Sequence, residues 1–387
     1  MSSSDDKKRL SGLARSIDDL FNGSGEGAAK APSEAMPPAR PAGEDVVWEE
    51  VPEEPRPGRT AQDADPQKLR DAVSDFLGAD PMAREGKARA IRDAAAALRE
   101  ANALDVLADS VERLTTGAGD PPDEACIAMA QALLSPGVAS RLAAYLGNAR
   151  DEDRRAELMR VCALLGHEMG LAISDALSGT QDRFARRIFL DAMVGMGEVA
   201  MPIVQQMAED SRWFVVRNAL AILGELSGDR SVELIVSTLA HTDARVRREA
   251  LLALAKVGGE DAGLLVYGMI EDTDPDVRLA AAMAAGALKV ERALRPLLAL
   301  LEGESDPDVV AGVLRALGQL GDPGAVNAIE KRAVGSFFSR PPADVRIAAY
   351  RALHNIGTPH AKSLLVQAAD DKDPAVKGAV RQLLGMR

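Results

Sequence analysis

The feature that most constrains this sequence is a short motif that returns about every 31 residues. In its full form an Asp is followed four residues later by Arg or Lys, as at Asp151/Arg155, Asp182/Arg186, Asp243/Arg247, Asp274/Arg278 and Asp373/Lys377. Asp120/Glu124 and Asp306/Val310 keep only the Asp, whereas Trp213/Arg217 and Pro342/Arg346 keep only the cation. The nine fourth-position residues are spaced by 31, 31, 31, 30, 31, 32, 36 and 31 residues. A period of this length indicates structural units that stack side by side.

Each unit carries the start and stop signals of a helix. The Asp is a good N-cap, because its carboxylate accepts backbone N–H groups of the first turn, and a Pro follows it where a helix tolerates one, at Pro275, Pro307 and Pro374. Eleven residues after the fourth position comes a residue that can close a helix with positive φ, namely Gly166, Gly197, Gly228, Gly258, Gly321 and Gly357, with Ser135 and Lys289 as exceptions. In the clearest unit we expect helices over 292–301 and 307–320, with Gly321 ending the second. The pattern predicts an all-α chain of about nine helical hairpins.

Composition agrees with close helix packing and narrows the classes of function. Of the 387 residues, 47% are hydrophobic but only 3% are aromatic, so Ala and Leu must fill the core. The net charge is −13, with 8 basic and 14 acidic residues in 1–66 and 38 and 45 in the rest, unlike the basic body of a non-specific nucleic-acid binder. Cys126 and Cys162 lie in apolar helical pattern and favour a reducing compartment. No secretory signal or membrane span is visible, so we expect a cytoplasmic protein.

The first 65 residues differ from the rest. They hold 7 of the 21 prolines and the acidic pairs Glu49-Glu50 and Glu53-Glu54, and such a composition buries too little apolar surface to offset the entropy of ordering. Residues 1–65 are therefore predicted to be a disordered acidic tail. Two apolar islands interrupt it. Residues 8–21 have the spacing of a short amphipathic helix, and Trp48 lies in the acidic segment 44–54.

The repeat resembles a known family. Residues 274–282, DPDVRLAAA in one-letter code, look like the inter-helix turn and second helix of HEAT repeats, and the short period resembles the phycobiliprotein-lyase-type class. The resemblance covers residues 102–387 and implies a right-handed α-α superhelical solenoid of the armadillo type, with 66–101 as N-terminal capping helices. It also implies that second helices line the concave face and that their arginines form a structural ladder between repeats. The predicted ladder consists of Asp151, Arg155, Asp182, Arg186, Arg217, Asp243, Arg247, Asp274, Arg278, Arg346, Asp373 and Lys377, with a break at Val310.

Several residues are candidates for contact with a partner. Phe337 and Phe338 lie in the insertion 335–342 that lengthens the 36-residue interval, where they either anchor a partner or cover the widened gap. Trp213, followed by Phe214, replaces the usual helix-opening Asp and either fills the groove between helices or faces the concave surface. Cations gather at the starts of second helices, at Arg154, Arg183, Arg187, Arg212, Arg245 and Arg248, beside acidic turns. Such a basic stripe attracts acidic peptides or phosphates, and we expect the chain's own acidic segment 44–54, with Trp48, to occupy it until a partner displaces it.

No catalytic, cofactor or metal site is predicted. His167-Glu168 tests a resemblance to deoxyhypusine hydroxylase, whose irons are held by repeated His-Glu pairs, but His241, His354 and His360 have no matching Glu and His167 is expected in a loop. Both cysteines are expected in the core. Bilin lyases, which attach or detach tetrapyrroles and are commonly heterodimers, give a resemblance without a diagnostic nucleophile or base here.

The function predicted from sequence is a non-catalytic protein–protein interaction scaffold or adaptor. Stacked repeats give an elongated surface suited to peptides or folded partners. A bilin-lyase-like or other HEAT-repeat enzyme subunit is the alternative, and a converging His/carboxylate set or a pocket-facing Cys would favour it. A nucleic-acid-binding helical-repeat protein is a further alternative, which the overall acidity disfavours.

Overall fold

A computed structural model describes residues 64–335 and 340–386. In these ranges the chain forms 20 α-helices, α2–α21, together with three short 3₁₀ helices, and contains no strand. The predicted all-α solenoid is therefore confirmed. The expected tail segments 8–21 and 44–54 and the paired phenylalanines Phe337 and Phe338 lie outside the described residues.

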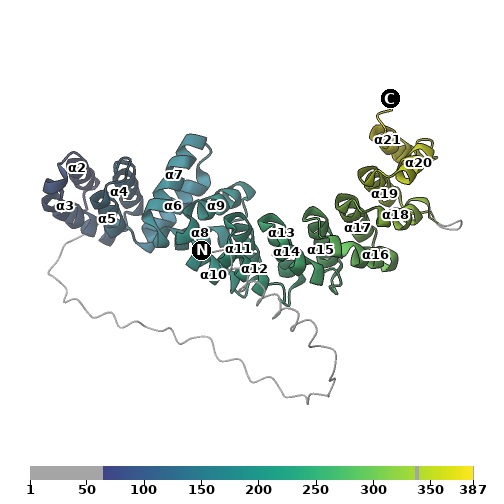
Figure 1. Cartoon of the computed structure of the whole chain (residues 1–387). Coiled ribbons are helices and arrows are strands. Elements are labelled where there is room, and N and C mark those ends of the chain that lie inside the picture. The colour runs from purple at the N-terminus through teal and green to yellow at the C-terminus, as the bar shows by residue number, and fades with distance from the viewer. Residues whose placement is uncertain (1–63, 336–339, 387) are drawn as a thin grey trace, which may run out of the picture. The chain divides into compact units, whose positions relative to one another are not determined.

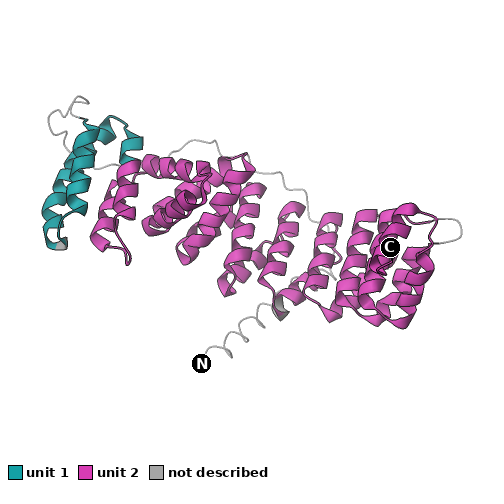
Figure 2. Ribbon diagram, turned by 90° about the horizontal axis from the view of Figure 1, so that it is seen from above, with its two compact units in different colours: residues 1–107 teal, residues 108–387 magenta. Residues whose placement is uncertain are grey.

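The chain divides into two compact units, residues 1–107 and residues 108–387 (Figure 2). In the first unit, α2 (Pro66–Leu77) packs against α3 (Pro81–Glu100). Leu69, Val73 and Phe76 of α2 are buried, and so are Ile91 and Leu98 of α3. Their spacing along each helix is that of a single apolar face, so α2 and α3 form a helix pair with its own core.

The second unit is built from alternating first and second helices (Figure 1). The first helices are α4 (Leu104–Thr116, which crosses the boundary between the units), α6 (Pro136–Asn148), α8 (His167–Gly179), α10 (Met201–Ala208), α12 (Asp229–Ser237), α14 (Glu260–Gly268), α16 (Leu294–Gly303), α18 (Val326–Val334) and α20 (Pro359–Ala368). The second helices are α5 (Glu124–Leu133), α7 (Glu152–Leu165), α9 (Arg183–Met196), α11 (Trp213–Leu226), α13 (Ala244–Val257), α15 (Pro275–Ala287), α17 (Pro307–Leu320), α19 (Ala343–Ile356) and α21 (Pro374–Leu383). Each second helix from α5 to α19 packs directly on the next one.

Small side chains let the second helices approach closely. A Cβ atom placed on Gly318 of α17 would lie 2.7 Å from the Cα of Ala352 in α19. A Cβ placed on Gly286 of α15 would lie 2.6 Å from the Cα of Ala316 in α17. Neither position has room for a methyl group unless the neighbouring backbone moves. The low aromatic and high alanine content of the sequence thus follows from the short distance between repeats.

The predicted caps set the helix boundaries. Six second helices, α7, α9, α13, α15, α17 and α21, open with an Asp whose side chain accepts a backbone N–H of the first turn. These residues are Asp151, Asp182, Asp243, Asp274, Asp306 and Asp373. One predicted start is wrong, because Asp123 and not Asp120 caps α5, through the N–H groups of Ala125 and Cys126. The second helix expected over 307–320 is confirmed as α17, whereas its partner begins with a 3₁₀ turn at Glu291–Ala293 and continues as α16.

The helix ends follow the glycine pattern. Gly166, Gly197, Gly258, Gly321 and Gly357 follow the last residues of their helices and all have positive φ. At one of the two exceptions, Lys289 takes a φ of 52° itself, so the backbone geometry persists without the glycine. The other exception, Ser135, caps the next helix by accepting the N–H of Val138.

No single helix in the described ranges is long and apolar enough to cross a membrane, although the bent pairs α5–α6 and α9–α10 pass that test by length and composition.

Candidate functional site

Three arginines on second helices each reach a carboxylate of the following repeat. Arg247 donates to both carboxylate oxygens of Asp272, at 2.8 Å each. Arg278 donates to Oε2 of Glu304 at 3.1 and 2.6 Å, and Arg346 donates to Asp371. All three arginines stand at the fourth position of their helix. We refer to Arg247, Arg278 and Arg346 as the closed arginines.

The closed arginines also hold the chain at backbone carbonyl groups. Arg247 donates to the carbonyl groups of His241 and Thr242, which precede its own helix. Arg278 does the same at Asp272 and Thr273. A guanidinium group can serve several acceptors in one plane. Each closed arginine therefore ties a turn to an acidic side chain one repeat further on.

The carboxylate acceptors share one position, two residues before the N-cap of a second helix, which we call the turn position. Its side chain accepts the backbone N–H of the N-cap residue, at 2.9 Å for Asp272, 3.0 Å for Glu304 and 2.8 Å for Asp371. Thr180 Oγ1 and His241 Nδ1 accept the same bond at 3.2 and 2.9 Å. Only a carboxylate has a second charged oxygen left for an arginine. A carboxylate at the turn position is therefore required to close the ladder at that repeat.

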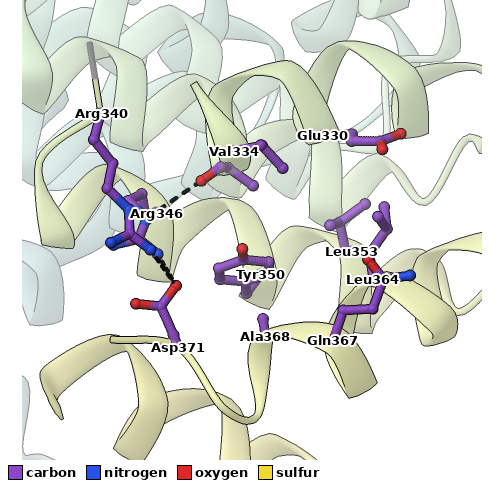
Figure 3. A pocket seen from close by; sticks show the side chains of 11 residues that line it. Glu330, Val334, Arg340, Arg346, Tyr350, Leu353, Leu364, Gln367, Ala368 and Asp371 are labelled. Atoms are coloured by element: carbon purple, nitrogen blue, oxygen red, sulfur yellow. Dashed lines mark hydrogen bonds and ion pairs between the residues drawn. The ribbon is translucent and has the colours of Figure 1, made fainter. Parts of the chain in front are cut away.

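The closed ion pairs are shielded from water. The side chains of Arg346 and Asp371 are 3% and 6% exposed, and those of Arg247 and Asp272 are 14% and 9% exposed. Burial alone would raise the pKa of Asp371, but the N–H of Asp373 and the charges of Arg346 and Arg340 hold that pKa below its ordinary value. Figure 3 shows Arg346 pointing at Asp371 beside a pocket that Tyr350 and Glu330 also line. Here the ladder is an internal structural element.

The ladder breaks at Val310, the position where the sequence predicts a break. An arginine from another helix binds the turn there instead. Val310 is buried and cannot hold the turn before α17. Arg332, from the first helix of the next repeat, donates instead to the carbonyl groups of Leu301, Glu302 and Glu304, the last two at 3.1 Å. The turn position facing Val310 is Arg340, which bonds to Asp371 at 2.7 Å. Arginine and carboxylate are thus both missing at this break.

The structure places Arg217 outside the ladder. Helix α11 begins at Trp213, so its fourth residue is Val216, which is fully buried. Arg217 is the fifth residue, and its guanidinium donates to Oδ1 of Asn218 at 3.0 Å instead of to a carboxylate. The turn position facing Val216 is His241, so arginine and carboxylate are again missing together. Arg248 holds the same fifth position on α13.

Arg217 lies near several other arginines and over the ring of Trp213. The Arg217 guanidinium lies 5.5 Å from the centre of the Trp213 ring, and Arg245 of α13 lies 4.0 Å from it. Burial lowers the pKa of Arg217, and the charges of Arg186 and Arg248 lower it further, against the nearby carboxylate of Glu249. We call Arg186, Trp213, Arg217, Arg245 and Arg248 the arginine cluster. It extends over α9, α11 and α13.

The cluster continues toward α7. Arg186 stands at the ladder position of α9, but the Asp at its turn position, Asp210, is bound by Arg212 at 2.9 and 2.8 Å. Arg155 faces Thr180, which has no carboxylate, and lies 5.9 Å from the ring of Phe184. We call Arg155 and Arg186 the open arginines. Neither ends on a carboxylate of the next repeat among the bonds of the described residues.

The other predicted contact residues are placed as follows. Arg187 pairs with its own helix neighbour Asp191 at 2.9 Å and is largely exposed. Arg245 pairs with the N-cap Asp243 at 2.7 Å, and Arg248 lies 3.7 Å from Glu249. Trp213 is half-buried. Trp48, Phe337 and Phe338 lie outside the described residues. Lys377, the remaining cation of the predicted ladder, forms an ion pair with Asp370 at 3.3 Å.

The histidines and cysteines are scattered. His167 was expected in a loop, and this prediction is wrong, because His167 is the first residue of α8. His360 contacts Glu330 at 2.9 Å. Cys126 and Cys162 are buried and belong to no disulfide, and burial raises the pKa of Cys162 to about 12. Within residues 64–335 and 340–386, no three His, Cys, Asp or Glu side chains gather as metal ligands would.

Comparison with known proteins fits this architecture. Two segments, residues 200–263 and 263–336, match the family model of HEAT repeats. This chain contains HEAT repeats. The curated protein sequences include no match to it. The narrower phycobiliprotein-lyase-type resemblance stays a prediction.

Solved structures similar to this HEAT-repeat chain include Kap121p bound to Pho4p, with 12% identity and a TM-score of 0.46 over 81% of this chain and 39% of that one. Human deoxyhypusine hydroxylase in complex with glycerol has 21% identity and a TM-score of 0.29, over 65% of this chain and 97% of that one. YibA of E. coli has 16% identity and a TM-score of 0.36, over 66% and 96%. The chain thus spans about two fifths of the Kap121p chain that it matches.

Some contacts between the HEAT repeats were not anticipated from sequence. Arg332 carries no periodic signal, because it comes from a first helix. The ring of Phe184 is centred 4.0 Å from the guanidinium carbon of Arg150, and Phe184 is 37% exposed. The sequence does not distinguish this phenylalanine from one in the core. The closing carboxylates do have a signal, which is an acid two residues before a capping Asp, as in Asp272-Thr273-Asp274. Reading that pair would have separated closed from open arginines.

Proposed function

We propose that this chain is a non-catalytic interaction scaffold that binds a protein partner through the arginine cluster. The observation that carries the proposal is the contrast between the two kinds of arginine. Arg247, Arg278 and Arg346 are closed by a carboxylate of the next repeat, whereas Arg186 and Arg217 are not. The cluster keeps positive charge at a surface that includes an aromatic ring.

Local charge makes an acidic partner the best match. The chain as a whole has a net charge of −13, so the cluster is a basic patch on an acidic protein. A patch of one sign raises the local concentration of oppositely charged partners and speeds their association. An arginine beside a tryptophan is also typical of the residues that dominate binding energy at protein interfaces. The cluster combines both features on three neighbouring second helices.

Quantitative affinity capture with full-length baits tests the proposal. The cluster bait carries R217Q and R248Q, and the matched control carries R315Q and R351Q, which remove the same charge from exposed residues of α17 and α19. Partners that depend on the cluster should fall by about tenfold with the first bait, because each lost charge contact weakens binding by up to about fivefold. They should be retained with the control bait. Equal recovery from both baits would refute the proposal, provided that circular dichroism shows both to be folded.

The insertion loop is a second place where a partner could anchor, and the same experiment separates it from the cluster. A third bait carries F337A and F338A. If the cluster is the binding surface, this bait should recover the partner like the unchanged chain. A loss confined to the third bait would instead assign binding to the insertion.

The acidic segment 44–54 supports a further part of the proposal, in which the chain's own tail competes for the cluster. This segment has six acidic residues, Glu44, Asp45, Glu49, Glu50, Glu53 and Glu54, and no basic one. Changing the last four to Gln in the full chain should tighten partner binding, because an intramolecular competitor is weakened. Unchanged affinity would contradict competition and leave the scaffold proposal intact.

A further inference from the structure

The second helices α7 to α19 present equivalent residues on their exposed side. The ninth residue of each helix is exposed, apart from that of α11, which is half-buried. These residues are Arg160, Asp191, Ala221, Leu252, Met283, Arg315 and Arg351. Only α13 and α15 among them have a large apolar side chain at this position, and Leu252 and Met283 are 41% and 40% exposed. The other five repeats hold a charged or small residue there, so the fold itself does not require an apolar one.

Leu252 and Met283 are neighbours because the second helices pack in register. Helix α13 packs on α15 as it does on α11. Glu225 and Lys256 are the thirteenth residues of α11 and α13, and they form an ion pair at 2.7 Å. Equal positions on neighbouring second helices therefore meet. The axes of packed helices are about 8–10 Å apart, so one large side chain placed between Leu252 and Met283 can touch both. We call Leu252 and Met283 the apolar patch.

The apolar patch adjoins the arginine cluster. Arg248 precedes Leu252 by four residues on α13, so the two side chains lie on one face of that helix. Both residues are exposed. Arg248 lies 3.7 Å from Glu249, which is too far for a hydrogen bond, so its N–H groups are open to a ligand. A cationic surface and an apolar surface thus meet on α13.

Such a surface suits a segment in which large apolar residues directly adjoin acidic ones. A carboxylate can bind Arg248, but it leaves the apolar patch in contact with water. An adjoining apolar side chain removes that area from water, which stabilises the complex. The chain itself contains a sequence of this kind, because the apolar residues 46–48 lie between the acidic pairs 44–45 and 49–50.

We infer that the apolar patch is the second half of the partner-binding surface, where it binds a large apolar side chain whose neighbouring carboxylate binds Arg248. The inference rests on the proposed function and deepens it, because it states that the acidic partner carries apolar residues next to its acids. The occupant is an acidic and apolar segment of a partner protein. A purely acidic segment would leave Leu252 and Met283 uncovered.

Two peptides and the full-length chain test this inference. The probe peptide has the sequence of residues 44–54 and a fluorescent label, so that fluorescence anisotropy measures its binding. The control peptide carries V46S, V47S and W48S and has the same charge. The probe peptide should bind at least about tenfold more tightly than the control peptide, because burial of one large apolar side chain is worth about tenfold or more.

Variants of the chain show where the preference arises. L252Q with M283Q should reduce the preference for the probe peptide to less than about twofold and leave the affinity of the control peptide unchanged. Glutamine is a good helix former, and L252A with M283A should act in the same way. The matched control, Y267Q with V366Q, removes apolar residues that are 42% and 63% exposed on α14 and α20, and it should keep the full preference. Circular dichroism verifies that each variant is folded.

Several results would overturn the inference. Equal affinity for the two peptides, or a preference that survives L252Q with M283Q, would show that the apolar patch is not used. Self-association of the unchanged chain that L252Q with M283Q abolishes would make the occupant a second copy of this chain and not a partner segment.

One further pair of substitutions separates this inference from the proposed function. R217Q with R248Q should weaken both peptides by about tenfold, since both carry the acidic residues. If that loss occurs while L252Q with M283Q has no effect, the inference falls and the proposed function stands. If neither pair affects peptide binding or partner capture, both fall.

Discussion

Replacing Arg346 with methionine should destabilise the C-terminal repeats far more than the same change at Arg217. Arg346 is 2% exposed and bonds to Asp371 and to the carbonyl group of Ala333. Methionine keeps the apolar stem of the side chain and adds no hydrogen-bonding group. The R346M variant therefore removes the charge and its bonds while preserving most of the packing.

The contacts that remain set the magnitude. Removing one partner of a buried ion pair costs about 3–5 kcal/mol, because the other charge stays buried. Asp371 keeps Arg340 at 2.7 Å and the N–H of Asp373 at 2.8 Å, which soften its loss. We therefore expect the lower end, about 3 kcal/mol. Arg217 has no carboxylate bond, so R217M should cost about 1 kcal/mol, the value of one hydrogen bond.

Hydrogen exchange is the appropriate assay, because a repeat array can open locally and a single unfolding free energy then averages over repeats. In R346M, amides of α18, α19 and α20 should exchange faster by about two orders of magnitude, which corresponds to about 3 kcal/mol. Amides of α9 and α11 should be unchanged. In R217M, exchange should rise by no more than about tenfold around α11.

The comparison between the two variants can refute the reasoning. If R346M and R217M accelerated exchange equally, the distinction between closed and clustered arginines would have no energetic basis. If R346M slowed exchange, the pair would cost more to desolvate than it returns, and the ladder would not stabilise the fold.

Four further outcomes follow from the described contacts. G318A should lower the urea-unfolding free energy by about 1–3 kcal/mol through overpacking, whereas G378A, which has open space in a helix interior, should raise it by about 0.5–1 kcal/mol. R332M should cost about 1–2 kcal/mol in the same assay, since a turn loses its donor, and R332K should fall between R332M and the unchanged chain. Because the pKa of Asp371 is lowered in the fold, its contribution to stability is complete above its unfolded pKa of about 3.9 and is lost as pH falls through the folded value. The protection of α19 amides from exchange should therefore hold from pH 7 to pH 5 and then decline, with a smaller decline in R346M. Cys162, with its pKa raised to about 12, should resist iodoacetamide at pH 8 in the folded chain and react once urea unfolds it.

Much of the fold could be predicted because helix boundaries are local. A capping Asp, a following Pro and a closing Gly each act within one turn, and α17 lies at the predicted residues 307–320. The start of α5 was missed because Asp120 and Asp123 both resemble caps, and only the tertiary path of the turn selects Asp123.

The site was less predictable because it depends on contacts between repeats. Arg217 was assigned to the ladder by its spacing, but α11 begins one residue earlier relative to the motif, at Trp213. A shift of one residue on a helix turns a side chain by about 100°, enough to move Arg217 from the buried row to the cluster. Arg332 was invisible, since its role arises only where Val310 leaves a turn without a donor.

The turn position has a consequence for how such arrays change over time. Without a carboxylate at this one loop residue, the preceding arginine is not held inside the protein. A substitution there, for example T180D opposite Arg155, could withdraw a charge from the surface without altering any helix. Two proteins with the same succession of helices could then recruit different partners, and comparison of their cores alone would miss the difference.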